Sequence, residues 1–199
     1  MESIQGKQSL HIEPADLLNW LAGYDNGLVD IGTGDGRFVK TFAEAHPEYF
    51  AIGIDTCREN LRVNSRCILP NALYLICNSR SLPSELYGRA KTITINFPWG
   101  SLLGDLLDKD PSFLFGLAAI AKPGAVLEVR VNADALQEYG LSLDEGVKKI
   151  QTALLLYGYK VLSFALLGPH ELRACQTTWA KRLAFGRDPC AFYIVAERM

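Results

Sequence analysis

Two acidic residues flank a glycine-rich loop in the first third of the chain. Asp30 ends an apolar run, Gly32 and Gly34 follow it in the string VDIGTGDGRF, and Asp55 ends the next apolar run. Glycines at alternate positions let the backbone turn sharply and approach a ligand closely. An acid at the end of the second strand can accept hydrogen bonds from both hydroxyls of a ribose. These residue types predict a nucleoside-binding loop; the alternative is a purely conformational turn, which would leave Asp55 without a role.

The ligand of this loop is predicted from how the pattern departs from a dinucleotide fingerprint. The glycines follow G-x-G-x-G instead of G-x-G-x-x-G, and Asp30 precedes them where it can face a positive charge. S-adenosylmethionine has a ribose, an adenine and a sulfonium but no phosphate, so the pattern favours it over NAD. The third predicted strand ends in CNSRSLP, which places Asn78, Ser79 and Arg80 beside the adenine.

A tryptophan stands at a turn directly after the fourth predicted strand, in the string NFPWG. Asn96, Phe97, Pro98 and Trp99 should lie beyond the carboxyl ends of the strands, where doubly wound sheets bind their ligands. Proline fixes its own φ and should hold Phe97 extended, so that backbone carbonyls can accept from an exocyclic amine. The indole offers a face on which a base can stack. We interpret Trp99 as a substrate-binding residue; the alternative is an indole that caps the core.

A second tryptophan near the C-terminus is followed by basic residues, in the string TTWAKRLAFGRDP. Trp179 precedes Lys181, Arg182 and Arg187. Aromatic side chains interleaved with positive charges suit contact with nucleic acid, because bases stack on the rings and phosphates pair with the charges. Taken alone, the string is equally compatible with a solvated helix face.

The motifs need elements that bring them together, and the hydrophobic pattern predicts alternating strands and helices. Strands are predicted at 27–31, 50–55, 72–77, 91–96, 125–131, 160–166 and 191–197, and helices at 14–22, 36–45, 57–66, 110–121 and 143–157. Strands separated by helices imply crossovers and a parallel sheet. We expect one α/β domain over residues 1–199 with a Rossmann-like, seven-stranded, mostly parallel sheet whose last strand is antiparallel. A hairpin within residues 1–12, turning at Gly6-Lys7, should precede it.

Composition limits the classes of protein to which the chain can belong. The formal net charge is −2, so binding to nucleic acid needs a local basic patch. The five cysteines have no C-x-x-C spacing, so we expect neither a disulfide framework nor a metal site. The N-terminus lacks the apolar core of a signal peptide, and the apolar run 113–121 is too short to span a bilayer. We expect a soluble, cytoplasmic monomer without a membrane partner.

Together, the strings VDIGTGDGR, GID, FPWGSLL and WAKRLAFGR resemble the aminoglycoside-resistance methyltransferases that modify N1 of adenine 1408 in 16S rRNA. The glycine loop is generic to class I methyltransferases, whereas the two tryptophan strings are more specific. The resemblance covers most of the chain and implies the 30S ribosomal subunit as partner. It implies that S-adenosylmethionine, which leaves as S-adenosylhomocysteine, is held by Asp30, Gly32, Thr33, Gly34, Asp55, Asn78, Ser79, Arg80, Asn96, Phe97, Pro98, Trp99, Ser101, Thr177 and Trp179.

For the target base, the resemblance implies a flipped adenine sandwiched by Trp99 and Trp179, with Pro98 contributing a backbone carbonyl. It also implies that positive side chains contact the RNA backbone. The candidates are Lys181, Arg182 and Arg187, together with Arg58, Arg62 and Arg66, which are spaced four apart on one face of the predicted helix 57–66. A solvated helix face is the alternative for the last three.

Three departures from the family pattern bear on RNA binding. Asp188-Pro189-Cys190 stand where further basic residues usually follow, the segment 132–146 is acidic where a positive contact is expected, and Arg80 replaces an acid. We therefore expect ribosome binding that is weaker or more sensitive to salt than is usual in the family.

Three other functions remain open at this point. Enzymes that methylate N7 of guanine in tRNA carry a Phe-Pro-x-Pro-Trp string after the fourth strand, but FPWG lacks the second proline. A small-molecule methyltransferase would fit the net acidity but leaves WAKRLAFGR unexplained. A non-catalytic partner with the same fold would not need the set of Asp30, Gly32 and Asp55.

Overall fold

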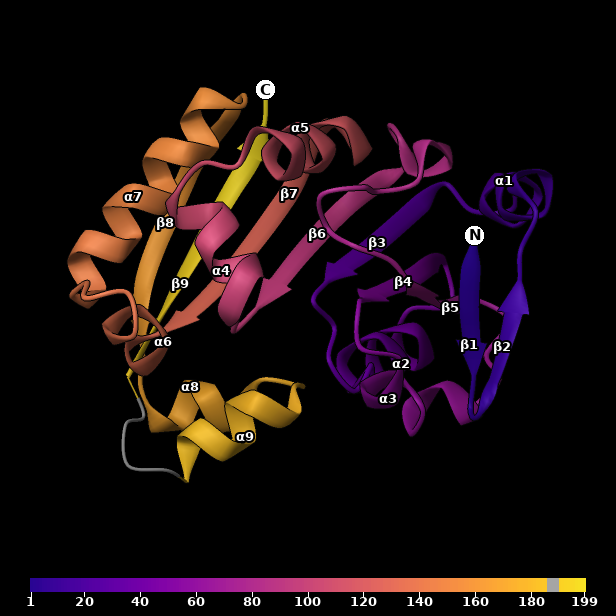
Figure 1. Cartoon of the computed structure of the whole chain (residues 1–199), viewed down its shortest axis with the longest axis horizontal. Coiled ribbons are helices and arrows are strands. Elements are labelled where there is room, and N and C mark those ends of the chain that lie inside the picture. Colours follow the sequence, from indigo (N-terminus) through magenta and orange to yellow (C-terminus); the bar gives the residue numbers. More distant parts are fainter. Residues whose placement is uncertain (186–189) are drawn as a thin grey trace.

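The computed structural model describes residues 1–185 and 190–199, and its centre is a twisted sheet of nine strands (Figure 1). The strands follow the order β2-β1-β5-β4-β3-β6-β7-β9-β8. Their bounds are β1 Glu2–Gln5, β2 Gln8–His11, β3 Asn26–Ile31, β4 Tyr49–Asp55, β5 Ala72–Ile76, β6 Ala90–Asn96, β7 Ala121–Asn132, β8 Tyr159–Leu167 and β9 Ala191–Arg198. Strands β5, β4, β3, β6 and β7 are parallel, and β9 pairs antiparallel with both β7 and β8.

This arrangement confirms the Rossmann-like α/β fold, with a seven-stranded, mostly parallel part in which the last strand runs antiparallel. The strand count is higher than predicted because the N-terminal hairpin joins the sheet. β1 pairs antiparallel with β5 at Ser3 and Leu75, and the hairpin turns at Gly6, whose φ is +61°. Ile4 is buried among α2 and β4 side chains, so pairing with the sheet edge also removes an apolar residue from water.

Helices cover both faces of the sheet. Their bounds are α1 Pro14–Ala22, α2 Arg37–Ala45, α3 Arg58–Leu61, α4 Gly100–Leu107, α5 Pro111–Ile120, α6 Ala133–Gln137, α7 Leu143–Leu156, α8 Pro169–Ala174 and α9 Thr178–Ala184, with 3₁₀ turns at Asn64–Arg66 and Ser84–Leu86. Residues of α1, α4, α5 and α7 share the main core with the sheet, whereas α2 and α3 pack against the opposite face. Pro14 is the first residue of α1, and Ser142 with Glu145 forms a capping box on α7.

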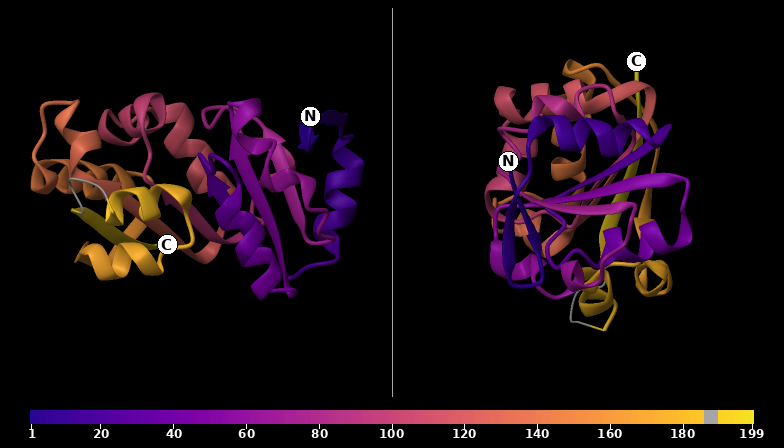
Figure 2. Two further views of the ribbon diagram at one scale, coloured as in Figure 1. Left: turned by 90° about the horizontal axis from the view of Figure 1, so that it is seen from below. Right: turned by 90° about the vertical axis from the view of Figure 1, so that its right-hand side faces the viewer.

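A third, smaller core lies beyond the carboxyl ends of the central strands. The segment between β8 and β9, where the hydrophobic pattern predicts no helix, forms α8 and α9, whose Leu172, Ala180 and Leu183 pack on Phe97. Figure 1 shows this pair beyond the arrowheads of β6 and β7, and the right-hand view in Figure 2 shows it projecting from that end of the sheet. The second tryptophan motif is therefore on a helix that faces the ends of the strands.

The predicted helix 57–66 is wrong as one element. α3 ends at Leu61, and a separate 3₁₀ turn covers Asn64–Arg66. Asn64 donates its amide to the Asp35 carbonyl over 2.7 Å, and Ser65 accepts from Gly6 N over 2.9 Å. Side chains of this type compete with helical hydrogen bonds when they find partners elsewhere. No helix in the described ranges is long and apolar enough to cross a membrane.

Candidate cofactor and RNA-base site

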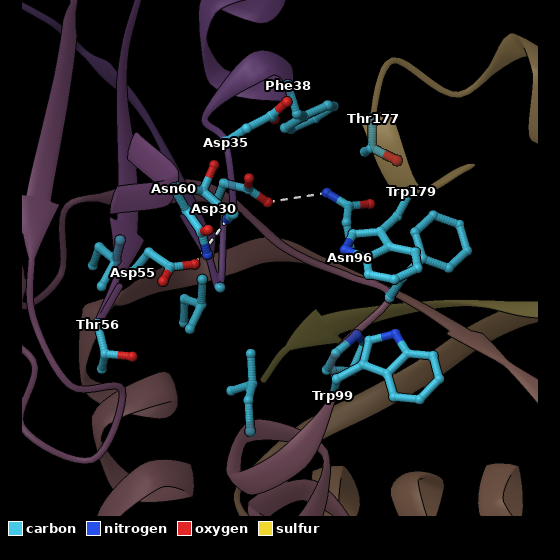
Figure 3. A pocket seen from close by; sticks show the side chains of 18 of the residues that line it. Asp30, Asp35, Phe38, Asp55, Thr56, Asn60, Asn96, Trp99, Thr177 and Trp179 are labelled. Atoms are coloured by element: carbon cyan, nitrogen blue, oxygen red, sulfur yellow. Dashed lines mark hydrogen bonds between the residues drawn. The ribbon is translucent and has the colours of Figure 1, made fainter. Parts of the chain in front are cut away.

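The predicted motifs converge on one cavity of about 490 Å³ at the carboxyl ends of β3, β4, β5 and β6. Figure 3 shows Asp55 and Thr56 on one side of it, the two tryptophans on the other, and Asp30 with Asn96 between them. Of the residues predicted for the site, those in its wall are Asp30, Gly32, Thr33, Gly34, Asp55, Asn78, Ser79, Asn96, Phe97, Pro98, Trp99, Ser101, Thr177, Trp179 and Arg182. The volume is that of a site for a small-molecule cofactor.

The glycine loop lies flat against the end of β4. Gly32 N and Thr33 N both donate to the Ile54 carbonyl, over 2.8 and 3.0 Å. Gly32 has φ +72°, which strains any residue with a Cβ, and a Cβ there would lie 2.4 Å from a methyl carbon of Leu102, which would have to move. At Gly34, with φ +59°, a Cβ would meet no atom within 4 Å. The backbone at Gly34 therefore faces open space in the cavity wall.

Asp55 is oriented by the backbone of the loops that it joins. Its Oδ2 accepts from Gly34 N and its Oδ1 from Cys57 N, each over 2.8 Å. Burial raises the pKa of this carboxyl, and the two backbone hydrogen bonds oppose the rise. Each carboxylate oxygen has more than one lone pair, so both can still accept from a ligand hydroxyl.

Asp30 is almost completely enclosed, at 1% exposed. Its Oδ1 accepts from Thr94 Oγ1 over 2.6 Å and from Asn96 Nδ2 over 3.0 Å. Burial raises the pKa of Asp30 to about 6, and hydrogen bonds and the charge of Arg130 limit the rise. At neutral pH the carboxylate is mostly ionised, and a cationic group of a ligand would be held at this place by charge.

The turn after β6 differs from the prediction. Phe97 is not extended: its φ is +54°, in the left-handed region, although Pro98 follows. Phe97 N donates to the Arg130 carbonyl over 2.8 Å, and the Phe97 ring is buried in the third core. Packing of the ring and this hydrogen bond outweigh the local preference for extended backbone before proline. The strained residue turns the chain so that Trp99, the N-cap of α4, lies at the mouth of the cavity.

The indoles of Trp99 and Trp179 face one another across the mouth. Their ring centroids are 5.8 Å apart and their planes differ by 30°. Trp179 lies in the first turn of α9, where Thr177 is the N-cap and accepts from Ala180 N over 2.9 Å. Trp179 is 42% exposed, and the Arg182 guanidinium lies 5.4 Å from its ring centroid. Two flat faces and a nearby positive charge are what a base with its phosphate requires.

Several wall residues were missed by the sequence reasoning. Asp35 and Phe38 belong to the glycine loop and α2, Asn60 to α3, and Thr178 to α9. Thr178 Oγ1 donates to Asp35 Oδ2 over 2.6 Å, which ties α9 to the glycine loop. Asp35 lies inside the GTGDG string, so the sequence pattern could have identified it as a site residue. No sequence pattern predicts its hydrogen bond with Thr178, which is 143 residues away.

Arg80 does not line the cavity, contrary to its predicted place beside the adenine. Its Nε donates to both carboxylate oxygens of Asp105 over 3.0 and 3.1 Å, and Asp110 lies 3.6 Å away. Asp105 is 2% exposed, so its charge requires a partner. That demand turns Arg80 toward α4, away from Ser79 and the cavity.

The arginines predicted to bind RNA from one helix face do not share a single helix. Arg58 and Arg62 are half-buried, Arg62 pairs with Glu59 over 3.3 Å, and Arg66 lies against the hairpin turn at Gly6. Lys181 and Arg182 follow Trp179 on α9. Arg187 lies outside the described residues.

Known proteins resemble this chain over its whole length. The solved structure of the 16S rRNA methyltransferase KamB has a TM-score of 0.89 and 27% identity and covers 100% of this chain and 99% of its own. A W203A variant of the 16S rRNA (adenine(1408)-N(1))-methyltransferase from Catenulisporales acidiphilia, solved with the cosubstrate SAM, has a TM-score of 0.84 and 25% identity, with 100% and 97% coverage.

Curated relatives carry the same description. The 16S rRNA (adenine(1408)-N(1))-methyltransferases of Streptoalloteichus hindustanus and Escherichia coli are each 30% identical, covering 94% and 96% of this chain and 94% and 95% of their own. The model of the family NpmA, described as 16S rRNA (adenine(1408)-N(1))-methyltransferase, matches residues 2–198. With these matches over nearly all of its length, the chain belongs to the family of 16S rRNA (adenine(1408)-N(1))-methyltransferases.

Proposed function

We propose that this chain transfers the methyl group of S-adenosylmethionine to N1 of adenine 1408 in 16S rRNA within the assembled 30S subunit. The observation that carries the proposal is the pair of facing indoles at the mouth of a cavity whose floor holds Asp30 and Asp55. Methylation of tRNA or of a small molecule would not call for this pair, and the family match does not favour either.

The chemistry of the wall fits the methyl donor. S-adenosylmethionine supplies an electrophilic methyl group on a sulfonium, with a ribose and a charged amino acid end. Asp55 accepts from the ribose hydroxyls, Asp30 faces the cationic part, and the open space at Gly34 lets the backbone approach. Asn78 and Ser79 border the adenine, while Ser101 and Thr177 close the far side of the wall. Arg80 has no place in this set, since it is committed to Asp105.

Trp99 and Trp179 bind the target base between their faces. An adenine between two rings needs about 7 Å, twice the ~3.5 Å contact distance of stacked carbon atoms. The present separation of 5.8 Å requires the rings to part by a small amount. Trp179 is the ring that moves, because it is half exposed on a seven-residue helix, while Trp99 is packed against the main core. Stacking on two faces offsets the few kcal/mol that base flipping costs.

The reaction asks little of the protein beyond placement. Adenine N1 carries a lone pair at neutral pH, so the transfer needs no general base. The side chains hold the base so that N1 lies in line with the methyl group, and Pro98 offers its backbone carbonyl to the exocyclic amine. Fixing two reactants in this way can account for a large part of an enzyme's rate acceleration.

The surface around the mouth supplies the contact with RNA. Lys181 and Arg182 on α9 lie beside the flipped base, and Arg58, Arg62 and Arg66 lie beyond the glycine loop, to which Asn64 ties their segment. We infer that the chain acts as a monomer in the cytoplasm, where it meets the 30S subunit, and that the modification reduces binding of aminoglycosides to that site.

The test is transfer of a tritiated methyl group to three substrates: 30S subunits, naked 16S rRNA and tRNA. We expect incorporation into 30S subunits and a primer-extension stop at adenine 1408. Incorporation into tRNA alone, or a stop at another nucleotide of 16S rRNA, would contradict the proposal. Equal incorporation into naked 16S rRNA would keep the target base but remove the requirement for the folded subunit.

A further inference from the structure

Arg130 does not line the cavity, and no sequence motif drew attention to it. It lies on β7 beside Asn96 of β6 in the parallel register, and its side chain is 16% exposed. A charge removed from water to this extent is stable only where its donors find partners. The partners of Arg130 connect it to three segments that build the site.

The first connection runs through the side chain of Asn96. Arg130 Nη1 donates to Asn96 Oδ1 over 2.9 Å, and Asn96 Nδ2 donates to Asp30 Oδ1 over 3.0 Å. A guanidinium has donors only, so it must face the amide oxygen and thereby turn the amide NH₂ group toward the carboxylate. Arg130 thus fixes the orientation of Asn96 and gives the buried Asp30 a donor.

The second connection holds the backbone that carries Trp99. Phe97 N donates to the carbonyl of Arg130 over 2.8 Å, at the residue whose φ is +54°. A left-handed residue other than glycine persists only where its surroundings hold it. The same position of β7 therefore fixes a side chain just before the turn and the backbone within it.

Further contacts immobilise the guanidinium. Nη2 donates to Glu128 Oε2 over 2.9 Å, and the group lies 4.4 Å from the centroid of the Tyr193 ring on β9. Cys175, at the end of α8, is near enough that the charge of Arg130 lowers the pKa of a thiol that burial raises. The guanidinium is thus held by β7 and β9 and lies beside the segment that leads to Trp179.

We propose that Arg130 is a positioning residue for methyl transfer: it holds Asn96, and through Asn96 the Asp30 carboxylate, in the arrangement that receives the methyl donor. The inference rests on the proposed function, since it concerns the same cavity. The planar fork of arginine serves Asn96 and Glu128 at once, whereas a lysine would supply the charge without this geometry.

The test measures binding of S-adenosylhomocysteine to the full chain by calorimetry, without RNA. Arg130→Met keeps the aliphatic stem and removes the charge and the donors, and we expect binding to weaken about 10- to 100-fold. The control is Arg198→Met, because Arg198 also lies over a tyrosine ring, that of Tyr159, but far from the cavity. Its affinity should stay within about twofold of the wild type. Arg130→Lys should recover part of the loss.

A double-mutant cycle separates this role from a general effect on the fold. If Arg130 acts through Asn96, then adding Arg130→Met to Asn96→Ala should weaken binding by less than about threefold. An equal loss in both backgrounds, or wild-type affinity in Arg130→Met, would overturn the inference. Should Arg130→Met not fold, Arg130→Gln takes its place in the cycle with the same expected results. Absence of binding to the wild-type chain would instead contradict the proposed function.

Discussion

At the scale of single residues, the buried carboxylate of Asp30 lowers the stability of the ligand-free fold at neutral pH but can bind a cationic ligand. Its carboxyl is enclosed at the end of a core strand, and burial raises its pKa from 3.8 to about 6. In the unfolded chain the group ionises near its ordinary value, so folding at neutral pH must bury a charge. A cationic ligand is what recovers that cost, because opposite charges attract strongly in a site with little water.

Asp30→Asn should therefore stabilise the ligand-free fold. A raised pKa makes the contribution of Asp30 to stability greatest below pH 4 and lost as the pH rises through 6. The variant should unfold with a free energy higher by up to about 3 kcal/mol at pH 8, and the gain should vanish toward pH 4. Urea denaturation at several pH values measures this. A variant less stable than the wild type at pH 8 would show that the carboxylate stabilises the fold.

The two indoles are predicted to matter more for binding of the target base than for binding of the cofactor, although both line the cofactor cavity. Trp99→Ala and Trp179→Ala should each lower methyl transfer about 10- to 100-fold or more, because a stacking face is lost. Binding of S-adenosylhomocysteine should persist in both. Trp20→Ala is the matched control, since Trp20 is 44% exposed on α1 and should leave transfer unchanged. Loss of cofactor binding in both variants would assign the indoles to the core instead.

The site residues that the sequence predicted correctly are those whose position follows from the order of strands and helices. Asp30, Asp55 and Trp99 each end a parallel strand or follow one, and such ends must meet at one edge of the sheet. Arg80 also follows a strand, but its side chain points away from the cavity because it pairs with the buried carboxylate of Asp105, 25 residues further along the chain. The role of Arg130 could not be predicted from the sequence either, because its partners belong to three elements that meet only in the folded chain.

At the scale of elements, we expect α9 to be the part of the site that moves when a base enters. It is seven residues long, and its buried residues are Ala180 and Leu183 in the small third core. The bond from Thr178 to Asp35 is its tie to the glycine loop. A short helix with little buried surface opens at low cost, which suits a wall that must admit a base.

Thr178→Val removes that tie with little change of shape. Amide hydrogen exchange in α9 should become about tenfold faster or more, since a hydrogen bond to a carboxylate is lost. KM for 30S subunits should rise while cofactor binding changes less. Thr152→Val is the control: its hydroxyl donates to the Lys148 carbonyl on α7, over 2.8 Å, away from the cavity. Unchanged exchange in α9 would show that the third core alone holds the helix.

Where the predicted and observed helices differ, contacts between distant segments explain the difference. α4 begins with glycine and serine and contains a second glycine, so its local propensity for helix is low. It forms because Leu103, Leu106 and Leu107 are buried against the sheet. The predicted helix 57–66 does not form as one element, although its arginines recur at helical spacing. Asn64 and Ser65 make hydrogen bonds with other segments instead of continuing the helix. Tertiary contacts decided both cases.

At the scale of the whole molecule, recognition of RNA must come from the placement of charge. The formal net charge is −2, so the chain as a whole does not attract RNA. Two segments that are tied to the glycine loop, α9 and the stretch 58–66, carry positive residues. The first carries Trp179 itself, and the second places Arg66 against the turn of the hairpin.

Reversing Arg58, Arg62 and Arg66 to Glu tests whether the second segment docks RNA. Each arginine that neutralises a phosphate steepens the fall of log K with log salt by about 0.9, so the variant should bind 30S subunits more weakly and with a shallower slope. Reversing Lys148, Lys149 and Lys160 to Glu makes the same change in net charge on α7 and β8. A filter-binding titration over several salt concentrations compares the two. If both variants weaken binding equally, only net charge matters; if the slope falls for the arginine variant alone, phosphates lie against the segment that Asn64 fastens to the glycine loop.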